Sequence, residues 1–157
     1  MKAASLKEIK TELSTLAPEQ LLDFCMHLAK YKKENKELLT YLLFEAGDEQ
    51  LYIEKVKEFI SEQFEDINKS NVYFIKKALR KILRLTNRYI KYSGSKQTEV
   101  ELLIYLCKII KNSEIPLHEK TALGNIYQRQ IQKTHKAIAL LHEDLQFDYS
   151  KEMKPLL

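Results

Sequence analysis

Seven positive charges and no negative one fall within residues 72–92, where they recur every three or four residues. Clustered Lys and Arg side chains bind the phosphates of nucleic acids, and aromatic rings stack on the bases of single strands. Tyr73, Tyr89 and Tyr92 lie among these charges. The candidate residues for binding an acidic partner or a nucleic acid are Lys77, Arg80, Lys81, Arg84, Arg88 and Lys91.

The element that must position these cations is one long amphipathic helix. Apolar or neutral residues recur at steps of four, three, four and three, which is the period of one helix face. They are Ile75, Leu79, Ile82, Thr86 and Tyr89. We therefore expect one side of the 72–92 helix to face the core and the cations to face outward.

The segment before this helix carries an acidic stripe that bears on the interpretation. Glu54, Glu58, Glu62 and Glu65 recur at steps of four, four and three. Two interpretations stay open. The cations form a solvated face paired with this stripe, or they are available to an acidic partner, which is RNA, DNA or protein. A second cationic row follows on the last predicted helix: Arg129, Lys133 and Lys136.

Motifs for other chemistries are missing from the sequence. The histidines lack the spacing of a zinc-protease helix or a di-iron bundle, and pairing with a carboxylate such as Asp144 is the simpler role for His135 and His142. There is no Gly-x-Ser-x-Gly motif and no glycine-rich phosphate loop. We expect no cofactor, no metal site and no enzymatic activity, although a site formed by residues distant in sequence stays open.

Composition favours an all-α protein. The chain has 157 residues, 45% of them hydrophobic and 31% charged, with three Gly and three Pro for tight turns. We expect a single domain over residues 1–157.

The N-terminus lacks the apolar core of a signal peptide, and no stretch reaches the roughly 20 apolar residues of a membrane span. Cys25 and Cys107 lie in apolar helical runs, which is typical of buried thiols in a reducing compartment. We therefore expect a cytoplasmic protein.

The sequence predicts about seven helices, arranged as an antiparallel bundle or a short superhelix resembling HEAT or armadillo repeats. Ser5 and Glu8 form a capping box for the first helix, and the later predicted boundaries follow from caps and apolar periodicity. The later helices span about 18–31, 35–46, 49–64, 72–92, 98–112 and 115–143, and residues 145–157 form a partly frayed tail. The 98–112 helix is apolar nearly all round, which places it at the centre of the fold.

Three polar or small residues carry specific local predictions. Asn35 is a candidate cap for the third helix, and Gly47 is suited to a left-handed position at its end. Gly124 lies inside the last predicted helix and costs about 1 kcal/mol of helix propensity relative to Ala. A close approach by a neighbouring backbone would offset that cost; the alternative is a break into two helices.

Two leucine- and lysine-rich segments resemble a family of short all-helical bacterial proteins of unknown function. They begin with Leu6-Lys-Glu-Ile-Lys and Lys30-Tyr-Lys-Lys, and the runs 77–92 and 127–131 fit the same pattern. The resemblance implies no functional residues. The composition and the helices favour a non-enzymatic interaction module that binds a protein partner or a second copy of itself. Nucleic-acid binding through the 72–92 helix is the alternative.

Overall fold

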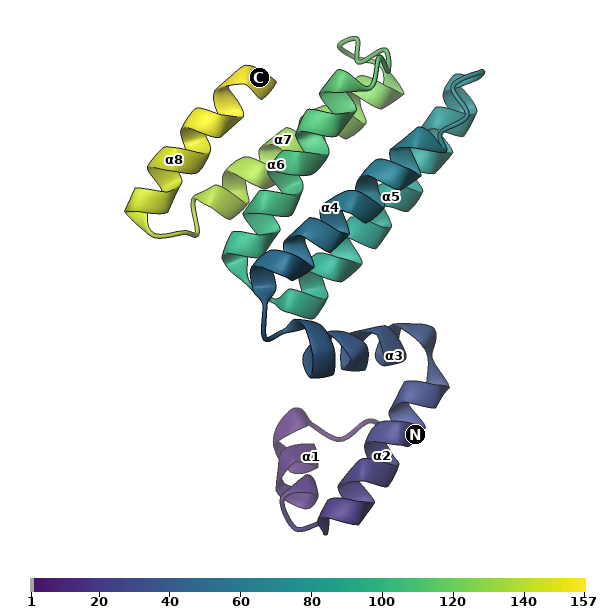
Figure 1. Ribbon diagram of the computed structural model, residues 1–157, viewed down its shortest axis with the longest axis vertical. Helices are drawn as coiled ribbons and strands as arrows, with labels where there is room; N and C mark the ends of the chain where they lie inside the picture. Colours follow the sequence, from purple (N-terminus) through teal and green to yellow (C-terminus); the bar gives the residue numbers. More distant parts are fainter. Residues whose placement is uncertain (1) are drawn as a thin grey trace. The chain divides into compact units, whose positions relative to one another are not determined.

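The computed structural model describes residues 2–157, and every regular element in that range is helical. The chain divides into two compact units, Met1–Phe44 and Glu45–Leu157. Unit 1 holds α1 (Leu6–Leu13), α2 (Pro18–Tyr31) and α3 (Lys33–Thr40), and a π-helical turn, Tyr41–Glu45, follows. Unit 2 holds α4 (Glu49–Glu65), α5 (Val72–Ser93), α6 (Lys96–Asn112), α7 (Ala122–Ile138), α8 (Glu143–Met153) and a 3₁₀ turn, Lys154–Leu156 (Figure 1). The all-α prediction is confirmed, with eight α-helices within residues 2–157 in place of about seven.

Local signals define the helices of unit 1. The predicted capping box is present: the Ser5 amide donates to Glu8 Oε2 at 2.7 Å, and the Glu8 amide donates to Ser5 Oγ at 3.3 Å. Pro18 begins α2, as predicted. The predicted cap at Asn35 is wrong, because α3 already begins at Lys33. Asn35 Nδ2 instead donates to the Leu28 carbonyl at 2.8 Å and ties α3 to the last turns of α2.

Side-chain caps also start the first three helices of unit 2. The Leu51 amide donates to Asp48 Oδ1 at 3.0 Å at the start of α4. Asn71 and Ser95 cap α5 and α6 in the same way. Gly47 does not take the predicted left-handed conformation; Gly94, with φ of 66°, takes it at the end of α5 instead.

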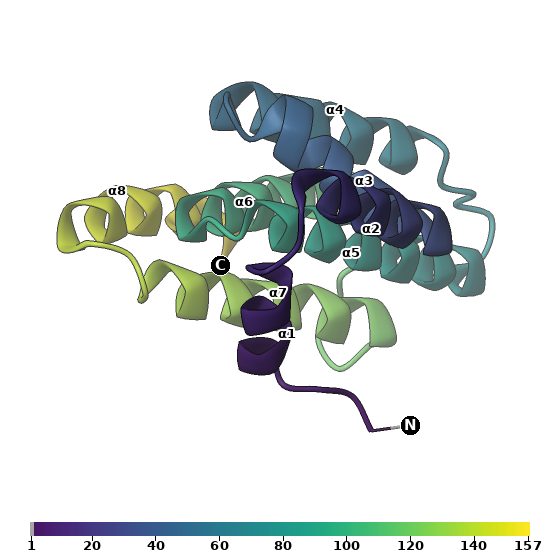
Figure 2. The same cartoon turned by 90° about the horizontal axis from the view of Figure 1, so that it is seen from below.

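Helix α6 lies at the centre of unit 2, as its apolar sequence predicts. It contacts α4, α5, α7 and α8, and in Figure 2 it lies between α4 and α7. Its buried residues are Thr98, Val100, Leu102, Leu103, Ile104, Leu106, Cys107 and Ile110. Cys107 is buried as expected, whereas Cys25 on α2 is exposed, which corrects the expectation of two buried thiols.

The predicted last helix, residues 115–143, is instead a loop followed by the shorter helix α7 and a turn that leads into α8. The chain forms a loop over residues 113–121, where Lys120 has a φ of 65°, and α7 begins only after the Thr121 cap. A turn over 139–142 then separates α7 from α8. The predicted frayed tail forms α8 and the 3₁₀ turn, because Met153 and Leu156 are buried in unit 2.

Hydrogen bonds hold the C-terminal turn against α6 and α7. The Tyr127 hydroxyl donates to the Leu156 carbonyl at 2.8 Å. Lys111 Nζ on α6 donates to the carbonyls of Pro155 at 2.8 Å and Leu157 at 3.2 Å. The 3₁₀ turn at residues 154–156 is therefore part of the fold of unit 2.

Replacing Tyr127 by Phe should lower the free energy of unfolding by about 1 kcal/mol at pH 8, because the Leu156 carbonyl loses its donor. Burial first, and then Cys107, raise the pKa of Tyr127 from 10.0 to about 12. A raised pKa in the folded state gives stability that is fully present below pH 10 and is lost as the pH rises to about 12. The gap between wild type and Tyr127→Phe should therefore shrink over that interval in urea unfolding experiments. A gap that stays constant would contradict the hydrogen-bonded, protonated phenol.

Candidate functional site

Helix α5 has the two faces that its sequence predicts. Ile75, Leu79, Ile82, Thr86 and Ile90 are buried. Ile90 takes the last place of the stripe, where Tyr89 was the predicted residue; Tyr89 is half-buried. The Thr86 hydroxyl donates to the Ile82 carbonyl at 3.0 Å, which satisfies it within the helix. The cationic side chains therefore point away from the core.

Two shallow surface grooves run along this cationic face. The first has a volume of about 600 Å³, and the second about 530 Å³. The first is lined by Asp66, Asn68, Tyr73, Phe74, Lys76, Lys77, Ala78, Arg80, Lys81 and Arg84. The second is lined by Arg80, Leu83, Arg84, Asn87, Arg88 and Lys91. Arg80 and Arg84 border both grooves, so all six candidate residues lie on one continuous surface, which we call the α5 groove.

The acidic stripe of α4 does not form ion pairs with the exposed cations of the α5 groove. Glu54 pairs with Lys57 on its own helix at 2.9 Å, and Lys81 Nζ donates to the amide oxygen of Gln63 at 3.0 Å. Within residues 2–157, no carboxylate lies within ion-pairing distance of the following four cations. They are Lys77, Arg80, Arg84 and Lys91. Arg88 is half-buried and is not counted among them.

An exposed aromatic pair stands at one end of the α5 groove. Tyr73 is 59% exposed and Phe74 is 44% exposed. Their ring centroids are 5.6 Å apart, with the planes at 72°. Tyr73 lines the groove beside the cations, whereas the ring of Tyr89 packs edge-on against Phe59, with the ring centroids 5.4 Å apart. Sequence reasoning did not name Phe74 as a candidate. Its place in the first turn of α5, directly before the buried Ile75 and beside Tyr73, is the pattern that could have identified it.

Lys133 is the member of the second cationic row that reaches the α5 groove. Its Nζ donates to Asn87 Oδ1, which joins α7 to the second part of the groove. Burial lowers the pKa of Lys133; Glu99 opposes that shift and Lys91 adds to it. Arg129 and Lys136 are exposed on α7.

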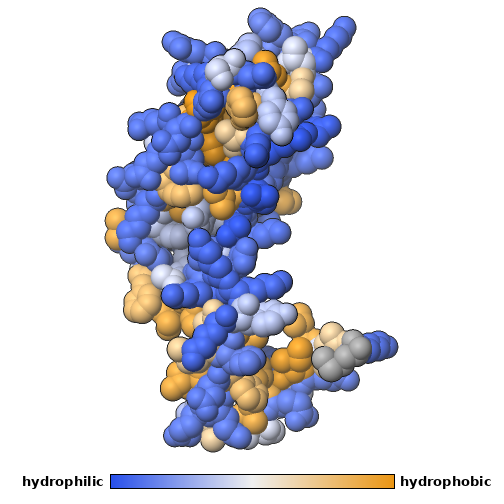
Figure 3. Space-filling view, turned by 90° about the vertical axis from the view of Figure 1, so that its right-hand side faces the viewer, coloured by the Kyte–Doolittle hydropathy of each residue, from blue (hydrophilic) through white to orange (hydrophobic). Residues whose placement is uncertain are grey.

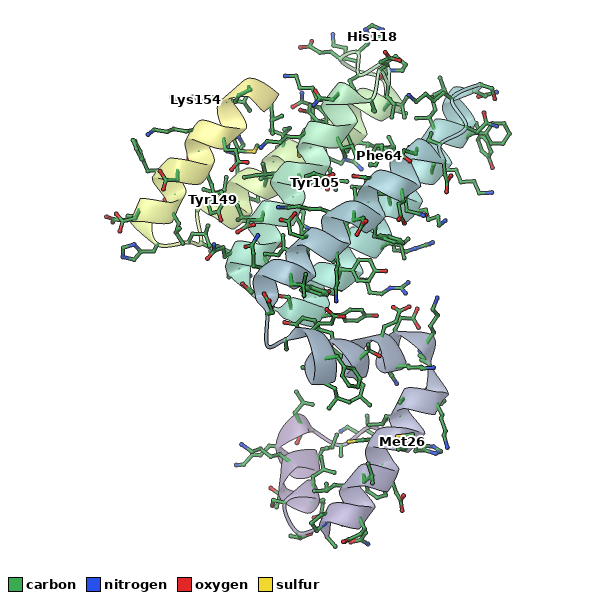
Figure 4. All side chains as sticks on the ribbon, viewed as in Figure 1. Met26, Phe64, Tyr105, His118, Tyr149 and Lys154 are labelled. Carbon is green, nitrogen blue, oxygen red and sulfur yellow. The ribbon has the colours of Figure 1, made fainter. Side chains whose placement is uncertain are left out.

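A second polar cluster lies between α4, α6 and α8, where Tyr105 and Tyr149 are labelled in Figure 4. The Tyr149 hydroxyl donates to Glu101 Oε1 at 3.0 Å, and burial followed by Glu101 raises the pKa of Tyr149 to about 12. The Tyr105 and Ser61 hydroxyls are 2.5 Å apart, and Lys108 pairs with Glu152. Each of these polar groups has its hydrogen-bond or ion-pair partner within the cluster, so the cluster links the three helices.

The histidines do not gather into a site. His142 Nδ1 lies 3.4 Å from Asp144 Oδ2, the carboxylate named from the sequence, and both side chains are exposed. His135 is exposed on α7. Across residues 2–157, no group of three His, Cys, Asp or Glu side chains is placed to hold a metal ion. None of the helices in that range is both long and apolar enough to cross a membrane.

No protein-family model, curated protein or solved structure matches this chain.

Proposed function

We propose that this protein is a non-enzymatic binding protein that holds the phosphate backbone of a nucleic acid in the α5 groove. The observation that carries the proposal is the row of exposed cations without ion-pair partners, Lys77, Arg80, Arg84 and Lys91. Lys81 and Arg88 also line the α5 groove, but they are not counted among these four cations. A cationic surface left without counter-charges attracts a polyanion and releases its bound counterions on binding.

The scaffold suits this role because the cations of the groove lie on one long helix. Helix α5 is 22 residues long and is fixed to the core through its buried face. Successive cations are about one turn apart, or about 5.4 Å along the axis. We infer that unit 2 is a bundle built around α6, since α6 contacts all four of its neighbours. Such a bundle presents the cations in a fixed row to successive phosphates.

The dependence of affinity on salt tests the proposal. If Lys77, Arg80, Arg84 and Lys91 each neutralise one phosphate, the logarithm of the binding constant for a single strand should fall with the logarithm of salt concentration at a slope of about −2.8. Fluorescence anisotropy of a labelled strand of about 20 nucleotides, measured between about 50 and 200 mM salt, gives that slope. Absence of binding at the lowest salt concentration, or a slope near zero, would refute it.

A second surface, on unit 1, supports the protein-interaction function. No side chain of α1, α2 or α3 is buried, and hydrophobic side chains gather on these helices in Figure 3. An apolar groove of about 590 Å³ lies between α1 and α2. Its walls include Ile9, Leu13, Leu16, Phe24 and Leu28. Units this small seldom bury enough apolar surface to be stable alone.

We propose a second copy of unit 1 as the occupant of this apolar groove. Glu8 and Glu12 line the groove, and α1 of a second copy offers both an apolar stripe and the exposed Lys7 and Lys10. A two-fold pairing of the same surface is the commonest form of oligomer. It would bury the apolar residues of both copies.

Light scattering should show the full chain as a dimer and the Phe24→Asp/Leu28→Asp variant as a monomer, because two charges would then enter the apolar groove. Both side chains are at least half exposed, so helical content should be retained in circular dichroism. Leu140→Asp, which changes a 66% exposed leucine in unit 2, is the matched control and should stay dimeric. A wild-type monomer at high micromolar concentration would rule out the second copy.

A further inference from the structure

The first part of the α5 groove has two chemically different sides. One side is suited to the phosphates of a bound strand and the other to its bases. Lys77, Arg80 and Arg84 line the groove along α5. Asp66 and Asn68, in the link between α4 and α5, also line it. A carboxylate repels phosphate, so the backbone of a bound strand has to follow the α5 cations. The bases would then face the link and the two aromatic rings.

Polar groups in the link are suited to base edges. Asn68 Oδ1 accepts a hydrogen bond from the Ser70 amide at 2.9 Å. That bond uses the amide oxygen and leaves the NH₂ group as a donor. The Asp66 carboxylate is an acceptor for the amino groups that bases carry. Paired bases in a duplex turn these edges toward each other, whereas unpaired bases present them outward.

Tyr73 and Phe74 provide the surface on which bases would stack. The rings meet edge to face at 72°, so the T-shaped pair leaves ring faces open to solvent, in keeping with exposures of 59% and 44%. Base–aromatic stacking needs an unpaired, splayed base and tolerates any sequence. A duplex, with its bases stacked on one another, cannot use these rings.

We infer that the α5 groove is a single-strand site, in which the phosphates follow the cations of α5 and one or two bases stack on Tyr73 and Phe74. This inference rests on the proposed nucleic-acid function and specifies the form of nucleic acid that the groove accepts. The distance along the helix from Phe74 to Lys91 is about 26 Å. That length accommodates roughly eight stacked nucleotides at 3.4 Å each.

The test compares one strand of mixed sequence, about 20 nucleotides long, with its own duplex, using the full chain. Wild-type protein should bind the single strand at least about tenfold more tightly than the duplex. Tyr73→Ala/Phe74→Ala should weaken single-strand binding by about 10- to 100-fold and leave duplex binding unchanged. Tyr73→Phe/Phe74→Tyr, which keeps both rings, should recover most of the single-strand affinity that the double alanine variant loses. Phe147→Ala, which removes a 63% exposed ring on α8, should bind like wild type.

The outcomes separate this inference from the function on which it rests. Equal wild-type affinity for strand and duplex, with no effect of Tyr73→Ala/Phe74→Ala, would overturn the single-strand site and leave phosphate binding in place. An equal loss of affinity for both forms in that variant would overturn it as well, since the rings would then serve the fold of α5. Failure of both nucleic acids to bind would overturn the proposed function and the inference together.

Discussion

Changing Arg80 and Arg84 together to glutamate is expected to weaken binding of a single strand by about 100-fold at moderate salt. These two arginines border both parts of the α5 groove. The double change removes two phosphate contacts and adds two charges that repel the strand. It should also reduce the magnitude of the salt slope by about 1.4, because each lost contact to a single strand is worth about 0.7.

The control for this prediction carries the same change in charge on another helix. Lys151→Glu/Lys154→Glu changes two exposed lysines of α8 and the 3₁₀ turn. Affinity in this variant should stay within about threefold of wild type, since only the long-range field changes and salt screens it within about 10 Å. If both double variants lose affinity equally, net charge and not the α5 groove governs binding.

Gly124→Ala should destabilise unit 2 by about 3 kcal/mol, although alanine favours helices. A Cβ at this position would lie 2.2 Å from the carbonyl oxygen of His118 and 3.0 Å from its carbonyl carbon. His118 belongs to the loop before α7 (Figure 4), and the Thr121 amide donates to the same carbonyl at 3.2 Å. The loop therefore cannot withdraw without losing the first turn of α7.

Urea unfolding followed by tyrosine fluorescence measures this loss, because seven of the nine tyrosines lie in unit 2. Gly47→Ala is the matched control, since a Cβ there meets nothing within 4 Å and the residue has no left-handed φ. That control should be neutral or stabilise the protein slightly. Equal stability of Gly124→Ala and wild type would show that the loop does not need the close approach.

The parts of the fold that depend on local periodicity were predictable from the sequence. The face pattern of α5 and the all-apolar character of α6 are encoded within single helices, and both are confirmed. The capping box at Ser5 and the cap at Asp48 are equally local. The close approach of a backbone to Gly124 was also one of the two explanations offered for a glycine inside a helix.

The features that sequence reasoning missed depend on contacts between distant segments. Residues 115–121 were predicted to be helical, yet they belong to a loop whose His118 carbonyl packs against Gly124. Met153 is buried through the packing of unit 2, which nothing in the tail itself reveals. Pairing between α4 and α5 is set in the same way, because Lys81 on α5 contacts the amide of Gln63 and not a carboxylate of the acidic stripe.

Mapping the site of a photo-crosslinked strand tests the central claim most directly. A single strand carrying a photoreactive base, irradiated with the full chain and then digested with trypsin, should label the peptide of residues 70–76, which contains Tyr73 and Phe74. Arg80→Glu/Arg84→Glu should abolish that label, and excess unlabelled strand should compete for it. Crosslinks confined to unit 1 or to α8, with residues 70–92 unlabelled, would contradict a nucleic-acid site in the α5 groove.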